Sequence, residues 1–177
     1  MHLTLPRPDL GASFIAALEE GFSFGDGKTK TALEIAAIEA GLGPYLALLN
    51  VQGGMVVLPN GGEVERMPHA QLWLTDGTEF LGVFNIRYRL TPRLRFRGGH
   101  IGYAIRPARR GQGLATLGLK LMLDHARAAG IGSAIVTCSD TNKASATVIE
   151  RNGGQLEAVL PDPDQDGMFR RYRIGTA

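Results

Sequence analysis

The alternation of apolar and polar positions divides the chain into a helical front and a mixed α/β remainder. Apolar residues at helical spacing predict helices over residues 9–20, 31–40 and 44–49, the first of them capped by Asp9. The glycine- and proline-rich stretch 50–68 has no such period and is predicted to be a connecting loop. The apolar stripe expected in the second helix consists of Leu33, Ala36, Ala37 and Ala40.

From residue 71 the apolar period changes to two, which is the spacing of a half-buried strand. Three successive strands are expected at 71–74, 80–90 and 99–105, followed along the chain by helices and strands in alternation. The dipeptide Asp76-Gly77 is expected to form the hairpin turn between the first two strands. Residues 91–98 are expected to connect the second strand to the third. This order predicts an antiparallel meander at the front of the sheet.

The clearest helix is expected over residues 113–129, between the strands at 99–105 and 134–138. Such a strand–helix–strand unit predicts a locally parallel pair with a right-handed crossover, so the whole sheet is expected to be mixed. The apolar stripe expected on this helix consists of Leu114, Leu117, Leu121, His125 and Ala128. The elements expected after it are a helix at 144–152 and two closing strands at 155–160 and 168–174.

Composition narrows the class of protein. The 177 residues, 44% apolar and 20% charged, suit one globular domain, and a net charge of +2 gives no reason to expect nucleic-acid binding. Cys138 is the only cysteine, so no internal disulfide forms, and a cytoplasmic location is expected. The 4 histidines have no metal-ligand spacing, so no metal is expected. No apolar stretch approaches about 18 residues, so no membrane partner is expected.

A local basic cluster stands out against this modest net charge. It allows two interpretations, a solvated strand edge and loop or a surface that attracts an anionic ligand. Its members are Arg87, Arg89, Arg93, Arg95, Arg97, Arg106, Arg109 and Arg110.

The segment Arg110-Gly111-Gln112-Gly113-Leu114-Ala115 lies between an expected strand and an expected helix. The first turn of a helix has N–H groups without internal partners and a partial positive charge, so it suits a phosphate. A P-loop would need a lysine where Leu119 stands, and a dinucleotide fingerprint would need a glycine where Thr116 stands. A glycine-rich helix start without any ligand is the remaining alternative.

This segment resembles the Q/R-x-x-G-x-G/A motif of the GCN5-related N-acetyltransferase (GNAT) superfamily. The order of strand, motif, long helix, strand and asparagine-initiated helix is also similar to that superfamily. A branch of bacterial predicted acetyltransferases is more similar still, in the segments 98–103, 137–142, 148–154 and 170–172. The resemblance covers about residues 67–174.

The resemblance implies a GNAT-like fold, with a mixed, mostly antiparallel sheet of about six to seven strands, helices on both faces and a splayed parallel strand pair. It also implies one acetyltransferase domain over 1–177, with a helical front and acceptor-side loop at 1–68 and a core that binds acetyl-CoA as co-substrate at 69–177. The residues that it implies for cofactor binding are Tyr103, Ala104, Ile105, Arg110, Gly111, Gln112, Gly113, Leu114, Ala115, Asn142 and Ser145, with Lys143 as a further candidate.

One position departs from the family pattern. Many members have a tyrosine seven residues after the asparagine, acting as general acid toward the departing thiolate, and this chain has Ile149 there. Either no side-chain acid is used, or Tyr103, Cys138 or Ser139 serves instead. Cys138 as a nucleophile is the less favoured interpretation, because a cysteine at a strand end is commonly a small buried apolar residue.

The acceptor amine has to lose a proton before it attacks, so a base is expected. His100 is the first candidate, because an imidazole titrates near neutrality and this one begins the strand implied to hold the acetyl group. The alternative for His100 is a hydrogen bond to a neighbouring strand. Further candidates for the base are Glu63, Glu65 and Glu79, while His69 and Trp73 could shape the acceptor pocket and His125 is expected to pack.

The function expected is acetyl transfer from acetyl-CoA to the amine of a small molecule or peptide, by direct attack on the thioester. Two alternatives from other classes remain. A non-catalytic acyl-CoA-binding or sensing module is kept open by Ile149, and a nucleotide-dependent oxidoreductase is disfavoured by Thr116. Exposed strand edges are compatible with a homodimer.

Overall fold

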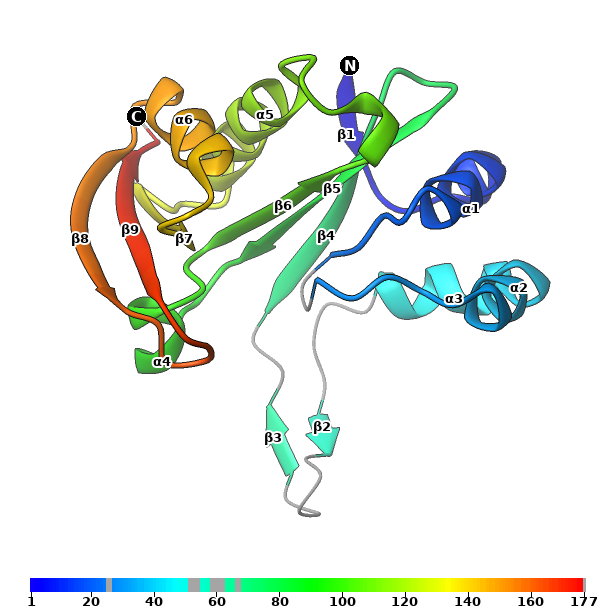
Figure 1. Cartoon of the computed structure of the whole chain (residues 1–177), viewed down its shortest axis with the longest axis horizontal. Coiled ribbons are helices and arrows are strands. Elements are labelled where there is room, and N and C mark those ends of the chain that lie inside the picture. The colour runs from blue at the N-terminus through cyan, green and yellow to red at the C-terminus, as the bar shows by residue number, and fades with distance from the viewer. Residues whose placement is uncertain (25–26, 51–54, 58–62, 66–67, 177) are drawn as a thin grey trace.

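The computed structural model describes the chain except residues 25–26, 51–54, 58–62, 66–67 and 177, and it describes no side chains between residues 51 and 67. The main body is a split β-sheet with helices on both of its faces (Figure 1). This is the fold class expected from the sequence, a GNAT-like α/β fold in which antiparallel pairing dominates.

The first part of the sheet has four strands in the order β1-β4-β5-β6. The meander expected from the period-two pattern is confirmed, because β4 pairs antiparallel with β5 and β5 pairs antiparallel with β6. The short β1, which the sequence pattern did not predict, pairs with β4 at the far edge. The bounds are β1 (His2–Thr4), β4 (His69–Thr75), β5 (Phe80–Arg87) and β6 (Ile101–Ile105).

The second part has three antiparallel strands in the order β7-β9-β8, so both closing strands are confirmed. Their bounds are β7 (Ser133–Ser139), β8 (Gln155–Pro161) and β9 (Met168–Gly175).

Strands β6 and β7 join the two parts and then diverge. The one bridge between them, Gly99 with Val136, is antiparallel, so the expected parallel pairing does not form among the described residues. The cause is the turn at Gly99, where φ is +69° and a Cβ atom would lie 2.3 Å from the carbonyl oxygen of Ile135. Both strands nevertheless lead to one place, because the hydroxyl of Tyr103 on β6 lies 2.9 Å from the Ser145 hydroxyl beyond β7. The splay is therefore present.

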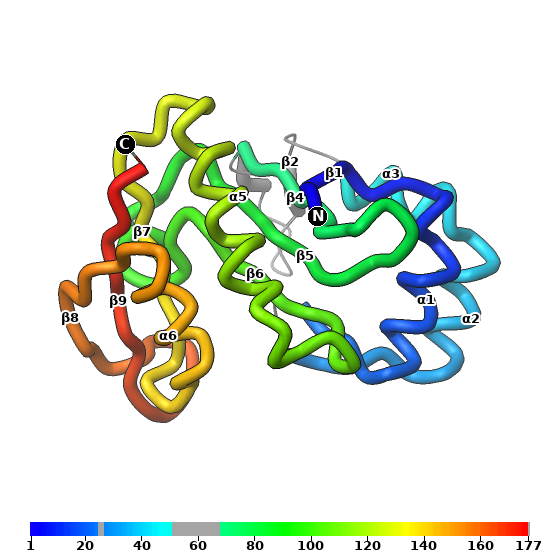
Figure 2. Tube along the Cα trace, turned by 90° about the horizontal axis from the view of Figure 1, so that it is seen from above, coloured from blue at the N-terminus to red at the C-terminus, as the bar shows by residue number. Residues whose placement is uncertain are grey.

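Two hydrophobic clusters lie on opposite faces of the four-stranded part. On one face α5 and α6 cover Leu72, Phe84 and Ile86, and on the other face α1 and its neighbours cover Trp73, Phe80 and Val83. Figure 2 shows the same arrangement, with α5 and α1 on either side of β5. The helices are α1 (Gly11–Glu19), α2 (Ala32–Ala40), α3 (Leu42–Leu49), α4 (Pro92–Phe96), α5 (Leu114–Ala128) and α6 (Lys143–Arg151).

The buried faces of two helices differ from the expected stripes. In α2 the buried residues are Ile35 and Ile38, whereas Leu33 is 85% exposed. In α5 the buried face contains Gly118, because the Phe84 ring packs where a Cβ atom would otherwise lie. The buried residues of α5 are Leu114, Gly118, Leu119, Met122, Leu123 and Ala126. Spacing alone identified the helices but not the faces that meet the sheet.

Local signals explain the helix starts in part. Thr31 caps α2 in a reciprocal capping box with Glu34. Asp9 does not cap α1 as expected, because it lies inside the 3-10 turn η1 (Pro8–Leu10) and pairs with Arg7 at 3.1 Å. The expected connection at 91–98 contains α4, and the expected loop at 50–68 contains the antiparallel hairpin of β2 (Met55–Val57) and β3 (Glu63–Glu65).

Candidate active site

The start of α5 has the geometry of an anion-binding turn. Gly111 and Gly113 have φ values of +76° and +75°, in the left-handed region that glycine adopts without strain. Gly113 is the N-cap, and no side chain caps the helix there. The first helical hydrogen bond runs from the Leu117 N–H to the Gly113 carbonyl at 3.1 Å. The preceding N–H groups of the first turn are therefore available to a ligand.

This turn opens into a pocket with a volume of about 650 Å³, which we call the splay pocket because it lies where β6 and β7 diverge. Its walls are the C-terminal half of β6, the glycine turn and one face of α6. The residues that line it are Tyr103, Ala104, Ile105, Arg109, Arg110, Gly111, Gly113, Leu114, Ala115, Thr116, Asn142, Ala144, Ser145, Thr147, Val148 and Arg151.

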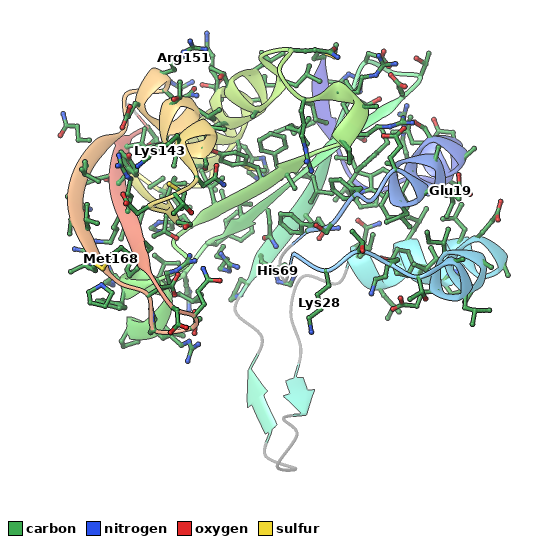
Figure 3. The ribbon with its side chains drawn as sticks, viewed as in Figure 1. Glu19, Lys28, His69, Lys143, Arg151 and Met168 are labelled. Atoms are coloured by element: carbon green, nitrogen blue, oxygen red, sulfur yellow. The ribbon has the colours of Figure 1, made fainter. Side chains whose placement is uncertain are left out.

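The splay pocket brings together the residues implied for cofactor binding, except Gln112 and the further candidate Lys143, which do not line it. Sequence reasoning missed the wall formed by α6. Ala144, Thr147, Val148 and Arg151 follow the spacing of one helix face, so the signal was present in the sequence. Figure 3 shows Arg151 and Lys143 at opposite ends of α6. Lys143 itself donates to the Asp140 carbonyl at 2.8 Å.

The three arginines near the turn have different roles. The Arg106 side chain, expected near the anion site, is instead buried and makes a salt bridge of 2.6 Å to Glu20 and another of 3.2 Å to Glu79. Arg109 pairs with the same Glu79 at 2.9 Å. Arg110 donates to the Ile105 carbonyl at 3.2 Å and lines the pocket. Hydrogen bonds from Arg106 hold the pKa of Glu20 below its usual range.

Most other described members of the basic cluster serve the fold. Arg87 donates to the Gly99 carbonyl at 3.1 Å, and Arg93 pairs with Asp164. Arg97 pairs with Asp162 at 3.0 Å and lies over the Phe169 ring, 5.2 Å from its centroid. These contacts favour a structural interpretation of this part of the cluster.

Tyr103 lines the splay pocket from β6. Its ring stacks on Phe84 with centroids 5.6 Å apart, and its hydroxyl lies 2.9 Å from the Ser145 hydroxyl. Burial raises the pKa of Tyr103 to about 12. The phenol therefore stays protonated at neutral pH, as a proton donor must. The same shift makes loss of that proton less favourable than from a thiol, whose pKa is ordinarily about 8.5.

The other residues expected to donate to the cofactor or its sulfur lie around α6, as does Ile149, the position that departs from the family pattern. Asn142 caps α6, because its Oδ1 accepts from the Ser145 N–H at 3.0 Å. Cys138 is buried, and burial raises the pKa of its thiol, so an activated thiolate is not favoured. The Ser139 hydroxyl lies 2.9 Å from the Thr141 hydroxyl. Ile149 is fully buried in the core and does not line the splay pocket.

His100 links the two parts of the sheet. The imidazole Nδ1 of His100 accepts from the Ile135 N–H at 2.9 Å, and the backbone N–H of His100 donates to the Ile135 carbonyl at 2.7 Å. Burial, with the nearby charges of Arg95, Arg173 and Arg87, lowers the pKa of His100. His100 does not line the splay pocket. This geometry favours the alternative weighed from the sequence, a histidine that bonds a neighbouring strand, and its role as base stays a prediction.

The other residues considered for the base or the acceptor pocket have different environments. Glu79 is paired with Arg106 and Arg109, and the side chains of Glu63 and Glu65 lie outside the described part of the chain. Trp73 is fully buried, with its ring 4.7 Å from that of Phe14. His125 Nε2 lies 3.0 Å from the Tyr88 hydroxyl, and His69 begins β4.

The described residues contain no group of three or more His, Cys, Asp or Glu side chains arranged to hold a metal ion. No single described helix is long and apolar enough to cross a membrane, while α2 and α3, bent by 94° at their junction, pass that test only as a pair.

Comparisons with known proteins agree with this geometry. Among solved structures, the chain is similar to the microcin C7 self-immunity acetyltransferase in complex with acetyl-CoA and AMP, with TM-score 0.61, 14% identity and 98% and 91% of the two chains covered. It is similar to a Salmonella typhimurium acetyltransferase that modifies the N-terminal serine of a 50S ribosomal subunit protein, with TM-score 0.62, 16% identity and coverage of 98% and 93%. It is also similar to a spermidine N-acetyltransferase from Vibrio cholerae, with TM-score 0.58, 13% identity and coverage of 99% and 95%.

At these identities the structural likeness shows the fold alone. Among curated protein sequences, none matches the chain. The family model described as the acetyltransferase (GNAT) domain matches residues 62–155, which is more than half of the chain and includes the glycine turn and the start of α6. The chain therefore belongs to the GNAT acetyltransferase family.

Proposed function

We propose that this protein transfers an acetyl group from acetyl-CoA to an amine, with acetyl-CoA held in the splay pocket. The observation that carries the proposal is the uncapped start of α5, where the first-turn N–H groups face a pocket of about 650 Å³. A pyrophosphate suits this place, because it accepts several N–H groups at once and its charge complements the helix dipole. Arg110 and Arg151 on the pocket walls add positive charge.

The remainder of the cofactor would lie along β6. Beyond the bridge at Gly99 this strand has no ladder partner on the side of β7 among the described residues, so its outward backbone groups can bond an extended ligand. We assign the backbone of Tyr103, Ala104 and Ile105 to the pantetheine arm, as the family resemblance implies. The amide nitrogen of Asn142 remains able to donate to the cofactor, because its Oδ1 caps α6.

The bound cofactor supplies a thioester, and the protein has to position an amine beside it and stabilise developing negative charge. We assign this stabilisation to backbone N–H groups of β6, whose residues Tyr103, Ala104 and Ile105 line the pocket. Tyr103 holds a proton beside them, bonded to Ser145. Because its pKa is about 12, we assign Tyr103 the role of a hydrogen-bond donor to the departing sulfur in preference to full proton transfer.

The whole chain is taken as one acetyltransferase domain, with residues 1–68 on the acceptor side. The acceptor is taken to be a small molecule or peptide amine, and the protein to act in the cytoplasm. A homodimer is compatible with the free edges of the sheet. A non-catalytic acyl-CoA-binding module is the second candidate. It is favoured by the buried Ile149, at the position where the family resemblance implies a tyrosine in many members.

Titration calorimetry with acetyl-CoA, with NAD and ATP as controls, tests the proposal directly. We expect selective binding of acetyl-CoA at about micromolar affinity. Release of free thiol in the presence of an amine panel then separates the enzyme from the binding module. A folded protein that binds no acetyl-CoA would contradict both candidates, and one that binds it but acetylates no amine would support the module.

A further inference from the structure

A hydrogen-bonded contact joins β6 to α6 across the splay pocket. The Tyr103 hydroxyl lies 2.9 Å from the Ser145 Oγ and 3.3 Å from the Ser145 carbonyl oxygen. Both residues line the pocket and both are only partly buried, so a ligand in the pocket can reach them. The family resemblance implies that Ser145 binds the cofactor, whereas the structure places its hydroxyl against Tyr103.

The position of the Tyr103 ring is fixed by packing. The ring stacks on Phe84, with centroids 5.6 Å apart and planes 21° from parallel. Phe84 is fully buried, and its ring fills the space beside Gly118 of α5, where a Cβ atom would lie 2.0 Å from it. Because a close-packed ring of this kind has little room to move, Tyr103 lies on a rigid support.

The position of Ser145 is fixed by the start of α6. Its backbone N–H donates to the Asn142 Oδ1 at 3.0 Å, so Ser145 belongs to the capped first turn of the helix. The hydroxyl hydrogen of a serine still rotates about the bond from Cβ to Oγ. Ser145 can therefore either donate to Tyr103 or accept from it without any movement of its heavy atoms.

The direction of this hydrogen bond decides what Tyr103 can do. A phenol has one proton to donate, while its oxygen can also accept a hydrogen bond. If Tyr103 donates to the Oγ or the carbonyl oxygen of Ser145, it has no proton left for a ligand in the splay pocket. If Ser145 donates to Tyr103, the phenol proton is free to bond a second acceptor. Only the second arrangement is compatible with a hydrogen bond from Tyr103 to the departing sulfur.

The same contact affects the acidity of the phenol. Burial raises the pKa of Tyr103 to about 12, and the hydrogen bond with Ser145 opposes that rise. A bond that opposes the rise stabilises negative charge on the phenol oxygen, and it thereby strengthens the phenol as a donor. Loss of the Ser145 hydroxyl would leave Tyr103 a weaker donor and free to turn its proton toward the Ser145 carbonyl.

We propose that Ser145 is a positioning residue, which donates to the Tyr103 oxygen and so directs the phenol proton toward the departing sulfur. As the amine nitrogen bonds to the acetyl carbon, the bond from that carbon to sulfur breaks and its electron pair stays on sulfur. Tyr103 and Ser145 both keep their protons, and the proton that the amine loses goes to the base. This inference rests on the proposed function, because it assigns a role within the same reaction.

The experiment measures kcat from thiol release at saturating acetyl-CoA, and acetyl-CoA affinity by calorimetry. The acceptor is whichever of spermidine, phenylalaninamide and a short peptide with a free N-terminus the wild type acetylates fastest. Ser145→Ala should lower kcat about three- to tenfold and change the affinity less than about threefold. Ser145→Thr keeps the hydroxyl and should recover most of the rate. Ser133→Ala at the start of β7 removes a hydroxyl that has no partner among the described residues, and it should change neither quantity.

A double-mutant cycle tests whether Ser145 acts through Tyr103. If it does, Tyr103→Phe already removes what Ser145 contributes, so adding Ser145→Ala should change kcat less than about twofold further. Adding Ser145→Ala to Tyr88→Phe should give the full loss of Ser145→Ala, because the Tyr88 hydroxyl contacts His125 and does not line the splay pocket. Independent roles of Ser145 and Tyr103 would instead multiply the two losses, to roughly 30- to 100-fold.

The outcomes separate this inference from the proposed function. A wild type that binds acetyl-CoA but releases no thiol with any of the acceptors contradicts the proposed function, and the inference with it. If the wild type is active, an unchanged kcat in Ser145→Ala overturns the inference alone, as do losses that multiply in the cycle. A loss of acetyl-CoA affinity without a loss of kcat would make Ser145 a cofactor ligand and would also overturn it. So would a low kcat in Ser145→Thr at unchanged affinity.

Discussion

Two pockets of this molecule, the splay pocket and a smaller one against β4 and β5, are built in different ways. The splay pocket takes all its lining from residues between Tyr103 and Arg151, and its central feature is the backbone of one turn. The smaller pocket, of about 210 Å³, is lined by Phe14, Phe22, Phe24 and Tyr45 among others. It combines side chains from α1, the segment after α1, α3 and the strands β4 and β5, which are far apart in the sequence. A cofactor common to a family can be bound by one local motif, whereas an acceptor specific to one protein needs side chains that only the tertiary fold assembles.

The largest effect is expected from a substitution in the glycine turn. Gly113→Glu should weaken acetyl-CoA binding at least about 100-fold, because it sets a carboxylate against the pyrophosphate and strains a residue at φ +75°. Calorimetry measures the affinity directly.

Gly167→Glu is the matched control for strain. Gly167 also has a positive φ, +114°, with open space around it, and it lies in the turn before β9, outside both pockets. We expect this variant to bind acetyl-CoA as the wild type does. Equal losses in both variants would mean that strain, and not the charge at the turn, determines the affinity.

This contrast also explains how much the sequence could predict. The glycine turn was found because its φ values and free N–H groups depend on a few adjacent residues. The sequence did not predict that Gln71 on β4 lies opposite Asn85 on β5, or that Asn85 lies opposite Gly102 on β6. These pairings depend on the register of three strands. Register follows from packing and turn geometry across the sheet, which one strand's pattern does not contain.

The errors in the helix faces have the same origin. The expected stripe of α5 included Leu117, which is 38% exposed, and omitted Gly118, which meets the Phe84 ring. Periodicity shows that an apolar face exists, but the shape of the partner surface decides which face is buried. The short elements β1, β2, β3 and α4 were missed because three to five residues carry too little periodicity to predict an element.

The second prediction concerns the ion pair that joins α1 to the segment before the glycine turn. Glu20 at the end of α1 is bonded to Arg106, whose backbone precedes the glycine turn. Glu20→Gln should lower the free energy of unfolding by about 1–3 kcal/mol, because a buried guanidinium loses a charged partner. Glu19→Gln, at the exposed neighbouring position, should have little effect. Chemical denaturation measures both.

The same pair predicts a pH dependence of stability. Because folding lowers the pKa of Glu20, its contribution is present above its ordinary pKa of 4.5 and is lost as pH falls through the lower folded value. The wild type should therefore lose more stability than Glu20→Gln between about pH 5 and pH 3. Parallel curves for the two proteins over this range would contradict the assignment.

The third prediction concerns Tyr103 in the splay pocket. Tyr103→Phe should lower kcat about tenfold and change acetyl-CoA affinity less than about threefold. The loss should be smaller than the 10²–10⁴-fold typical of a well-matched acid, since a pKa of about 12 is far from the working pH. Tyr88→Phe removes a phenol that contacts His125 elsewhere and should leave the rate unchanged. A loss above about 1,000-fold would restore Tyr103 as a full general acid.

The smallest expected effect belongs to His100, where the structural and catalytic interpretations diverge. His100→Ala should cost about 1 kcal/mol of stability, because the Ile135 N–H loses its acceptor, and His100→Asn should recover much of it by placing Oδ1 near the position of Nδ1. Since folding lowers the pKa of His100, its stabilising contribution is lost as pH falls below about 6.5, and both variants should lack that loss. If His100 only links the strands, the rate of acetyl transfer should recover in His100→Asn together with the stability. If it is the base, stability should recover while the rate stays low in both variants at every pH, because neither side chain accepts a proton.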